Sequence, residues 1–106
     1  MGKYLLQGNY AGDGIKGLLK EGGTRRRSAV EKLLHSVGGS VESMYYAFGE
    51  SDFCIIVDVP DHVSAIAAIL VANASGAVKV RTTVLVSTED VDRAVNMTTD
   101  YAPPGR

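Results

Sequence analysis

Polar side chains occur at alternate positions of three apolar segments, and together they could bind a small ligand. The segments span residues 3–10, 52–59 and 78–86, and each is rich in residues typical of β-strands. Side chains two positions apart on a strand share a face. A cation beside amides and a carboxylate can orient a small polar or anionic molecule. The candidate ligand-binding residues are Gln7, Asn9, Asp58, Lys79 and Arg81, with one of Tyr45 and Tyr46.

Strand direction predicts that Asn9, Asp58 and Lys79 lie toward one end of the sheet, with Gln7 and Arg81 nearer its middle. A simpler interpretation places Lys79 and Asp58 in solvent at the rim, and lets Arg81 bond across a subunit boundary. Catalysis would need an ionisable group with a shifted pKa in a closed pocket. The candidates for that role are Tyr45 or Tyr46, Asp58 and Arg81, whereas His35, His62 and Cys54 are poorly placed.

Two further clusters could do chemistry, and each has a structural explanation. Thr24 and the run Arg25, Arg26 and Arg27 open a helical segment, where an anion such as phosphate could bind, or where the basic side chains are simply solvated. Glu50 and Asp52 could act as an acid and base pair, but stabilisation of a turn also explains Asp52. His35 and His62 lack metal-ligand spacing, so we expect no metal, and we expect no cofactor.

The element that organises the chain is a predicted hairpin within residues 38–61. Strands are expected over residues 41–48 and 52–59, joined by the loop Gly49-Glu50-Ser51-Asp52. If Phe48 faces Phe53, Tyr45 pairs with Ile56, and Tyr46 joins Phe53 on the opposite face. A shift of the register by one residue would exchange the two tyrosines.

The remaining segments complete a βαββαβ order with a short helix after it. A strand is expected over residues 3–10, then a helical region broken at Gly22-Gly23, with Thr24 as N-cap of its second part and Gly38 as the C-terminal stop. Asp61 can cap the next helix, and Ser87 a third that runs to about Met97. The second helix is expected to bury Val63, Ile66, Ala67, Leu70 and Ala74.

This order predicts an α+β, ferredoxin-like domain over residues 1–97 and a mobile, proline-containing tail over 98–106. Strands one and three should be central in a four-stranded antiparallel sheet, with the two main helices on one face. Phe53, Ile55 and Val57 should point to the helices, as should Val78, Val80, Thr82 and Val84. The helix-free face would combine the candidate ligand residues with Leu5, Cys54, Ile56, Thr83 and Leu85. Because this face is too apolar for water, we expect a second copy to cover it.

The hairpin also carries a family resemblance. Gly49-Glu50-x-Asp52, an apolar strand and Pro60-Asp61, with Gly38-Gly39 before the first strand, resemble the GYD domain family. The family's Gly, Tyr, Asp signature falls on Gly49, Ser51 and Asp52, so a serine stands where the tyrosine is expected. The resemblance implies a ferredoxin-like fold that self-associates, as in dimeric α+β barrels, in a family whose biochemical role is largely undefined.

Composition narrows the possible partners. The net charge of −1 gives no general attraction to nucleic acid or to an anionic membrane, and the longest apolar run, residues 65–72, is too short to span a bilayer. The single cysteine, Cys54, excludes a disulfide within the chain. We expect a cytoplasmic protein whose partners are itself, as a dimer or higher homo-oligomer, and possible small organic or anionic ligands, with neither nucleic acid nor membrane.

Three functional hypotheses follow from the sequence. The first is a non-enzymatic ligand-binding or regulatory module with a cavity between the sheets of neighbouring subunits. The second is a cofactor-independent monooxygenase or isomerase of the dimeric α+β barrel type, although fold analogy alone does not transfer chemistry. A trimeric PII-like nucleotide binder shares the strand order, but it would be expected to have a longer glycine-marked loop than residues 49–52 offer.

Overall fold

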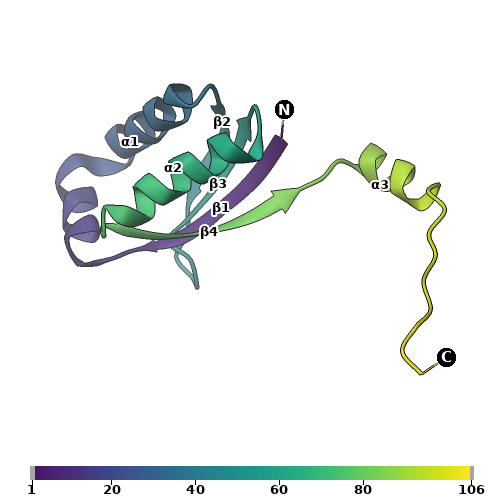
Figure 1. Cartoon of the computed structure of the whole chain (residues 1–106). Helices are drawn as coiled ribbons and strands as arrows, with labels where there is room; N and C mark the ends of the chain where they lie inside the picture. The colour runs from purple at the N-terminus through teal and green to yellow at the C-terminus, as the bar shows by residue number, and fades with distance from the viewer. Residues whose placement is uncertain (1, 106) are drawn as a thin grey trace.

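The computed structural model describes residues 2–105, and their elements follow the predicted order. Helices α1 and α2 lie together on one face of the sheet (Figure 1). The fold is therefore α+β and ferredoxin-like, as the sequence predicts. Its elements are β1 (Gly2–Tyr10), α1 (Gly12–Ser36), β2 (Ser40–Tyr46), β3 (Phe53–Val59), α2 (His62–Ala74), β4 (Val78–Leu85) and α3 (Thr88–Val95).

The sheet is antiparallel, and its strand order β2-β3-β1-β4 puts β1 and β3 in the centre, as predicted. Leu6 pairs with Ile55 on one side and with Thr82 on the other, which fixes the side chains that share its face. That face meets the helices and contains most of the core. The buried apolar side chains are Leu6, Leu34, Met44, Phe53, Ile55, Val57, Val59, Ala65 and Ala68.

Helix α1 is broken at Gly22, as the paired glycines predict. Gly22 has φ 81° and ψ 171°, a conformation that favours glycine, and the second part of the helix starts from it. Thr24 is therefore inside the helix, and its predicted role as N-cap is wrong. The predicted stop at Gly38 is confirmed: at φ 80° its N–H donates to the His35 carbonyl, and the Gly39 N–H donates to that of Leu34. These two bonds form a Schellman motif.

Helix α2 begins where predicted, because the Asp61 carboxylate accepts a hydrogen bond from the Ser64 N–H at 2.8 Å. The predicted buried face is wrong. Ala65 and Ala68 are buried, whereas the residues expected in the core are exposed. The helix has alanine, valine, isoleucine or leucine on every face, so the spacing of its apolar residues does not show which face is buried. The exposed residues are Val63, Ile66, Ala67, Leu70 and Ala74.

The hairpin register also needs correction. Tyr45 pairs with Cys54 rather than Ile56, and Tyr46 pairs with Phe53, so the loop spans residues 47–52 and Phe48 is fully exposed. The shift is by two residues, so the tyrosines keep the faces that the pairing of Phe48 with Phe53 would give them, and the alternative shift by one residue is excluded. The Asp52 carbonyl accepts from the Ala47 N–H at 2.9 Å, which closes the longer loop. The loop bends toward the side of the sheet away from the helices (Figure 1).

The C-terminal segment leads away from the sheet (Figure 1). Ser87 caps α3 as predicted, because its hydroxyl accepts from the Asp90 N–H at 3.0 Å, but the helix ends at Val95 rather than near Met97. No residue of α3 is buried, and its apolar Val91 and Val95 are exposed. This helix gains no burial from the domain.

Candidate functional site

A row of four polar or polarisable side chains crosses the middle of the helix-free face. Strand pairing places Tyr45 of β2 beside Cys54 of β3, Cys54 beside Gln7 of β1, and Gln7 beside Arg81 of β4. The Gln7 amide donates to the Cys54 sulfur at 3.5 Å. The predicted central position of Gln7 and Arg81 is therefore confirmed. The phenol and the guanidinium lie at opposite ends of this row.

The hairpin loop orients Arg81. Its Nη2 donates to the Ser51 hydroxyl at 2.6 Å, and its Nη1 donates to the Asn9 side-chain oxygen at 3.5 Å. The Asn9 amide in turn donates to the Glu50 carbonyl at 3.0 Å. Ser51 is 8% exposed, and no signal in the sequence pointed to its contact with Arg81. The contact gives Ser51 a structural role.

Asp52 fixes this loop against β1. Its Oδ2 accepts from the Tyr10 N–H at 2.9 Å, and its own N–H donates to the Gly8 carbonyl at 2.8 Å. The carboxylate thus satisfies a backbone donor, which supports turn stabilisation as the role of Asp52. Glu50 is exposed and contributes its carbonyl to Asn9.

Asp58 is not where the strand-direction argument places it. It pairs with Lys3 at one end of β1, whereas Asn9 pairs with Lys79 at the other end. The error arose because antiparallel β3 runs opposite to β1, so its last residues meet the first residues of β1. Lys3 Nζ donates to Glu42 at 2.6 Å and to Asp58 at 2.9 Å, and the bond to Glu42 is the main reason that its pKa is raised.

The two tyrosines occupy opposite faces, and the structure assigns them. Tyr45 is on the helix-free face with 70% of its surface exposed. Tyr46 is on the helix face, where its hydroxyl donates to the Gly23 carbonyl at 2.8 Å. Burial raises the pKa of Tyr46, and it raises the pKa of the neighbouring Tyr10 to about 12. Of the predicted pair, only Tyr45 belongs to the candidate site.

The rest of the helix-free face is apolar toward the Lys3 end. Leu5 pairs with Ile56 and with Thr83, directly beside the polar row, and Leu85 pairs with Lys3. Leu5, Ile56 and Leu85 each retain partial exposure. A ligand at the polar row would therefore have apolar neighbours on one side and Asn9 and Lys79 on the other.

The predicted basic cluster does not converge on one point. Arg27 lies 3.9 Å from Glu31, and Arg26 lies 3.4 Å from Glu21. Thr24 and Arg25 are exposed, while the Arg26 Nε is buried. Its entry into the groove between α1 and α2 was not predicted, because a run of three arginines does not show which side chain turns inward.

Within residues 2–105, no group of three or more His, Cys, Asp or Glu side chains is arranged to hold a metal ion. No helix in the same range is both long and apolar enough to cross a membrane.

The family model for the GYD domain matches residues 4–95. The chain belongs to the GYD domain family. The match contains the whole sheet except its first two residues, together with α3 and the hairpin loop over residues 47–52, which is called the signature loop below. Comparison with curated proteins and with solved structures found no match. The resemblance places the family's signature on Gly49, Ser51 and Asp52 of this GYD protein, and the last two make side-chain bonds that join the loop to β4 and β1.

Proposed function

We propose that this GYD protein is a self-associating, non-enzymatic module that binds a small polar or anionic organic ligand between the helix-free faces of two subunits. The proposal rests on the row from Tyr45 to Arg81 on the helix-free face. In this row the Arg81 guanidinium is held by its bond to Ser51, and the Tyr45 phenol is exposed. The proposal extends to a regulatory role, in which the ligand biases the assembly.

Self-association is supported by the apolar part of this face. Leu5, Ile56 and Leu85 are adjacent to the polar row and partly exposed. The area of the sheet face follows from its dimensions: four strands lie about 4.8 Å apart, each is about eight residues long, and the rise is about 3.3 Å per residue. These values give a face of roughly 500 Å² per subunit. Two such faces bury about 1,000 Å², near the lower limit for a specific interface. The expected assembly is a two-fold dimer that dissociates on dilution.

Ligand recognition would depend on Arg81. Its guanidinium offers donors suited to a carboxylate or phenolate, and the bonds to Ser51 and Asn9 hold it in place before a ligand arrives. Lys79 adds a second cation at the Asn9 end of the face. Exclusion of water by a second subunit would strengthen each of these interactions. An aromatic or aliphatic acid would satisfy both the cations and the apolar neighbours.

Light scattering over a range of protein concentrations tests the assembly. We expect the wild-type mass to approach that of a dimer, and Ile56→Lys to give a monomer because it places a charge among apolar residues of the contact. Leu19→Lys is the matched control, because Leu19 is 83% exposed on α1, away from this face. A wild type that remains monomeric at high concentration, or a Leu19 variant that dissociates equally, would contradict the proposed interface.

Thermal-shift screening against organic acids, phenols and nucleotides tests the ligand. A compound that binds only the native state raises the apparent melting temperature. Arg81→Ala should abolish the shift, while Arg93→Ala on the exposed α3 should leave it unchanged. A shift that survives Arg81→Ala would remove this side chain from the site.

A cofactor-independent monooxygenase or isomerase remains the alternative function. It is favoured by one feature, the placement of a phenol and a cation in the same cross-strand row, where Arg81 could stabilise an oxyanion. Incubation of each stabilising compound with the protein in air, without added cofactor, separates the two functions. Recovery of the compound unchanged supports a binding module, and formation of product that Arg81→Ala prevents supports an enzyme.

A further inference from the structure

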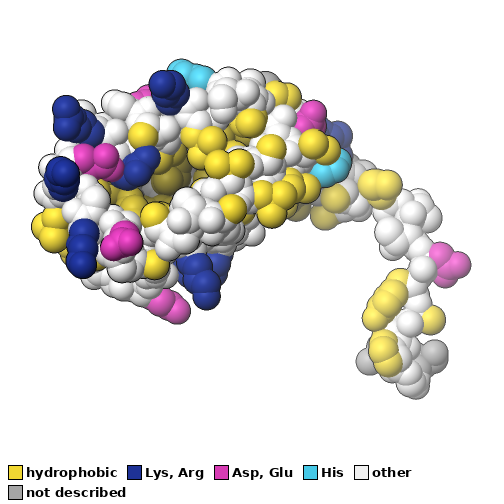
Figure 2. All heavy atoms as spheres, turned by 60° about the vertical axis from the view of Figure 1, so that its left-hand side comes forward, with side chains coloured by type: hydrophobic (Ala, Val, Ile, Leu, Met, Phe, Trp, Pro, Cys, Tyr) yellow, Lys and Arg dark blue, Asp and Glu magenta, His cyan; other side chains and the backbone are white. Residues whose placement is uncertain are grey.

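A cavity lies on the helix side of the sheet, between α1 and α2. Its volume is about 330 Å³, at the lower end of the range for small-molecule pockets. Leu6, Phe53 and Ile55 form its floor, with Val30 on the α1 side and Ile69 on the α2 side. Figure 2 shows a hollow lined by hydrophobic side chains on this side of the molecule, with basic side chains close to it. The cavity arises because the two helices leave part of the core uncovered.

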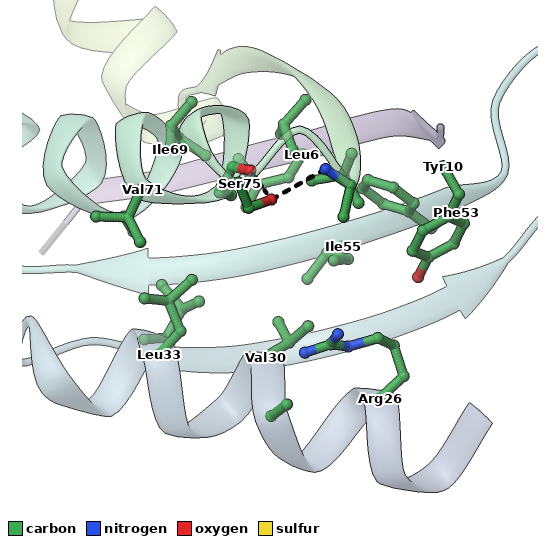
Figure 3. Close-up of a pocket in the computed structure, with 17 residues that line it drawn as sticks. Leu6, Tyr10, Arg26, Val30, Leu33, Phe53, Ile55, Ile69, Val71 and Ser75 are labelled. Carbon is green, nitrogen blue, oxygen red and sulfur yellow. Dashed lines mark hydrogen bonds between the residues drawn. The ribbon is translucent and has the colours of Figure 1, made fainter. Parts of the chain in front are cut away.

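Arg26 supplies the charge at this cavity. It is the one charged residue among the described residues that line it, and Figure 3 shows it reaching from α1 toward the space bordered by Val30, Ile55 and Phe53. Its Nε is enclosed by protein atoms and has no hydrogen-bond partner within residues 2–105, while 37% of the side chain stays exposed. Because a guanidinium at the edge of an otherwise uncharged lining favours an anionic acceptor, Arg26 indicates a ligand with a negatively charged end.

The other polar groups of the cavity already have partners or remain neutral. The Ser75 hydroxyl donates to the Ala72 carbonyl at 2.6 Å and accepts from the Ala77 N–H at 3.2 Å, the bond drawn in Figure 3. Tyr10 stacks its ring at a tilt against Phe53, with centroids 5.4 Å apart, and burial raises its pKa to about 12, so it stays uncharged at neutral pH. Glu21 Oε1 lies 3.4 Å from Arg26 Nη1, so a ligand carboxylate would share the guanidinium with this side chain.

We infer that this cavity binds an amphipathic organic monocarboxylate, whose apolar body lies along the floor and whose carboxylate accepts from Arg26. A carboxylate accepts charge-assisted hydrogen bonds from a guanidinium, and the apolar lining requires a hydrocarbon or aromatic body. The site is independent of the helix-free face, because alternate residues of the strands point to opposite sides of the sheet. It therefore stands whether or not the face-to-face dimer forms.

Octanoate and 1-octanol are the probes, because they share an apolar chain and differ in charge. Calorimetric titration of the full chain should show tighter binding of octanoate than of octanol. In the series hexanoate, heptanoate and octanoate, affinity should rise by up to about fourfold per methylene, the value of one buried CH₂. Arg26→Gln should lower the affinity for octanoate by about tenfold, as expected for the loss of a hydrogen bond to a charged group. The affinity for octanol should stay unchanged.

Arg27→Gln is the matched control, since Arg27 is exposed on the next position of α1 and pairs with Glu31. Methyl NMR shifts locate the site independently: octanoate should move the signals of Val30 and Ile69 and leave Leu5 unaffected. Ala72→Leu, which fills the cavity from α2, should abolish binding of both probes while circular dichroism stays native.

Equal binding of octanoate and octanol, or equal losses in the Arg26 and Arg27 variants, would overturn the inference. So would methyl shifts confined to the helix-free face. A further outcome would also overturn it. If octanoate dissociates oligomers of the wild type but not those of a chain that ends at residue 86, then the cavity is the binding site of the C-terminal segment of a second copy.

Discussion

Removal of the Asp52 carboxylate should loosen the signature loop and lower stability by a predictable amount. Asp52 Oδ2 is the acceptor for the Tyr10 N–H at 2.9 Å, and both residues are half-buried. A hydrogen bond to a charged group is worth about 1.5–3 kcal/mol, and the partial exposure reduces this to about 1–2 kcal/mol for Asp52→Ala. For a domain of this size each kcal/mol corresponds to about 4–8 °C, so the melting temperature should fall by about 5–15 °C.

Two further variants separate the side-chain bond from other effects. Asp52→Asn keeps an oxygen that can accept from Tyr10, so it should cost less than half as much as Asp52→Ala. Glu50→Ala is the control in the same loop: its side chain is exposed and its carbonyl is retained, so stability should change by no more than about 0.5 kcal/mol.

Urea unfolding followed by circular dichroism gives the free energies of unfolding, and amide exchange at Tyr10 reports the bond directly. Protection of the Tyr10 amide should be lost in Asp52→Ala and retained in Glu50→Ala. Equal stabilities of these two variants, or continued protection of Tyr10 without the carboxylate, would refute the role given to Asp52.

Three other predictions concern single structural features. Gly38→Ala should destabilise by about 1 kcal/mol or more in urea unfolding, because its φ is 80° and a Cβ would lie 3.3 Å from Pro60, whereas Gly49→Ala meets nothing within 4 Å and should be neutral. The hydrogen bond from the Ser64 N–H lowers the pKa of Asp61 in the folded protein below its ordinary value. The cap therefore stabilises the fold fully above the pKa that Asp61 has in the unfolded chain, and this stabilisation is lost as the pH falls through the pKa of the folded state. An Asp61→Ala variant should therefore show a smaller decline in melting temperature between pH 5 and pH 2 than the wild type. Amides of α3 should exchange at nearly unprotected rates in the monomeric Ile56→Lys variant, since an unpacked helix of this length is marginal in water; protection there would show that α3 packs on its own domain.

The fold was predictable because the informative signals are local. Glycine at Gly22 and Gly38, the carboxylate of Asp61 and the hydroxyl of Ser87 each act within a few residues, and all four boundaries are where these residues predict. Strict alternation along β1, β3 and β4 likewise assigned the two faces of the sheet. These signals do not require knowledge of the partner strand.

Features that depend on distant contacts were harder to predict. The outer face of α2 is as apolar as its inner face, so the choice between Leu70 and Ala68 depends on how closely the helix approaches the sheet, which favours the smaller side chain. Asp58 was misplaced because its position follows from strand direction across the sheet. The sequence does not predict the contacts of Ser51 and Arg26, because a serine in a turn and an arginine in a basic run are common and each contact depends on the tertiary structure.

The signature loop lies between the two proposed sites and contacts elements of both. Ser51 binds Arg81 on the helix-free face, while the adjacent Asp52 holds the backbone of Tyr10, whose ring lines the cavity between the helices. Adjacent strand residues alternate between the two sides, so Val80 lines the cavity and Arg81 faces away from it. A displacement of the loop can therefore move groups at both sites, whereas Arg81→Ala and Arg26→Gln each alter one. We expect Asp52→Ala to change the ligand affinity of both sites, and each arginine variant to change the affinity of one site alone. This pattern would identify the loop as the element that couples the two sites.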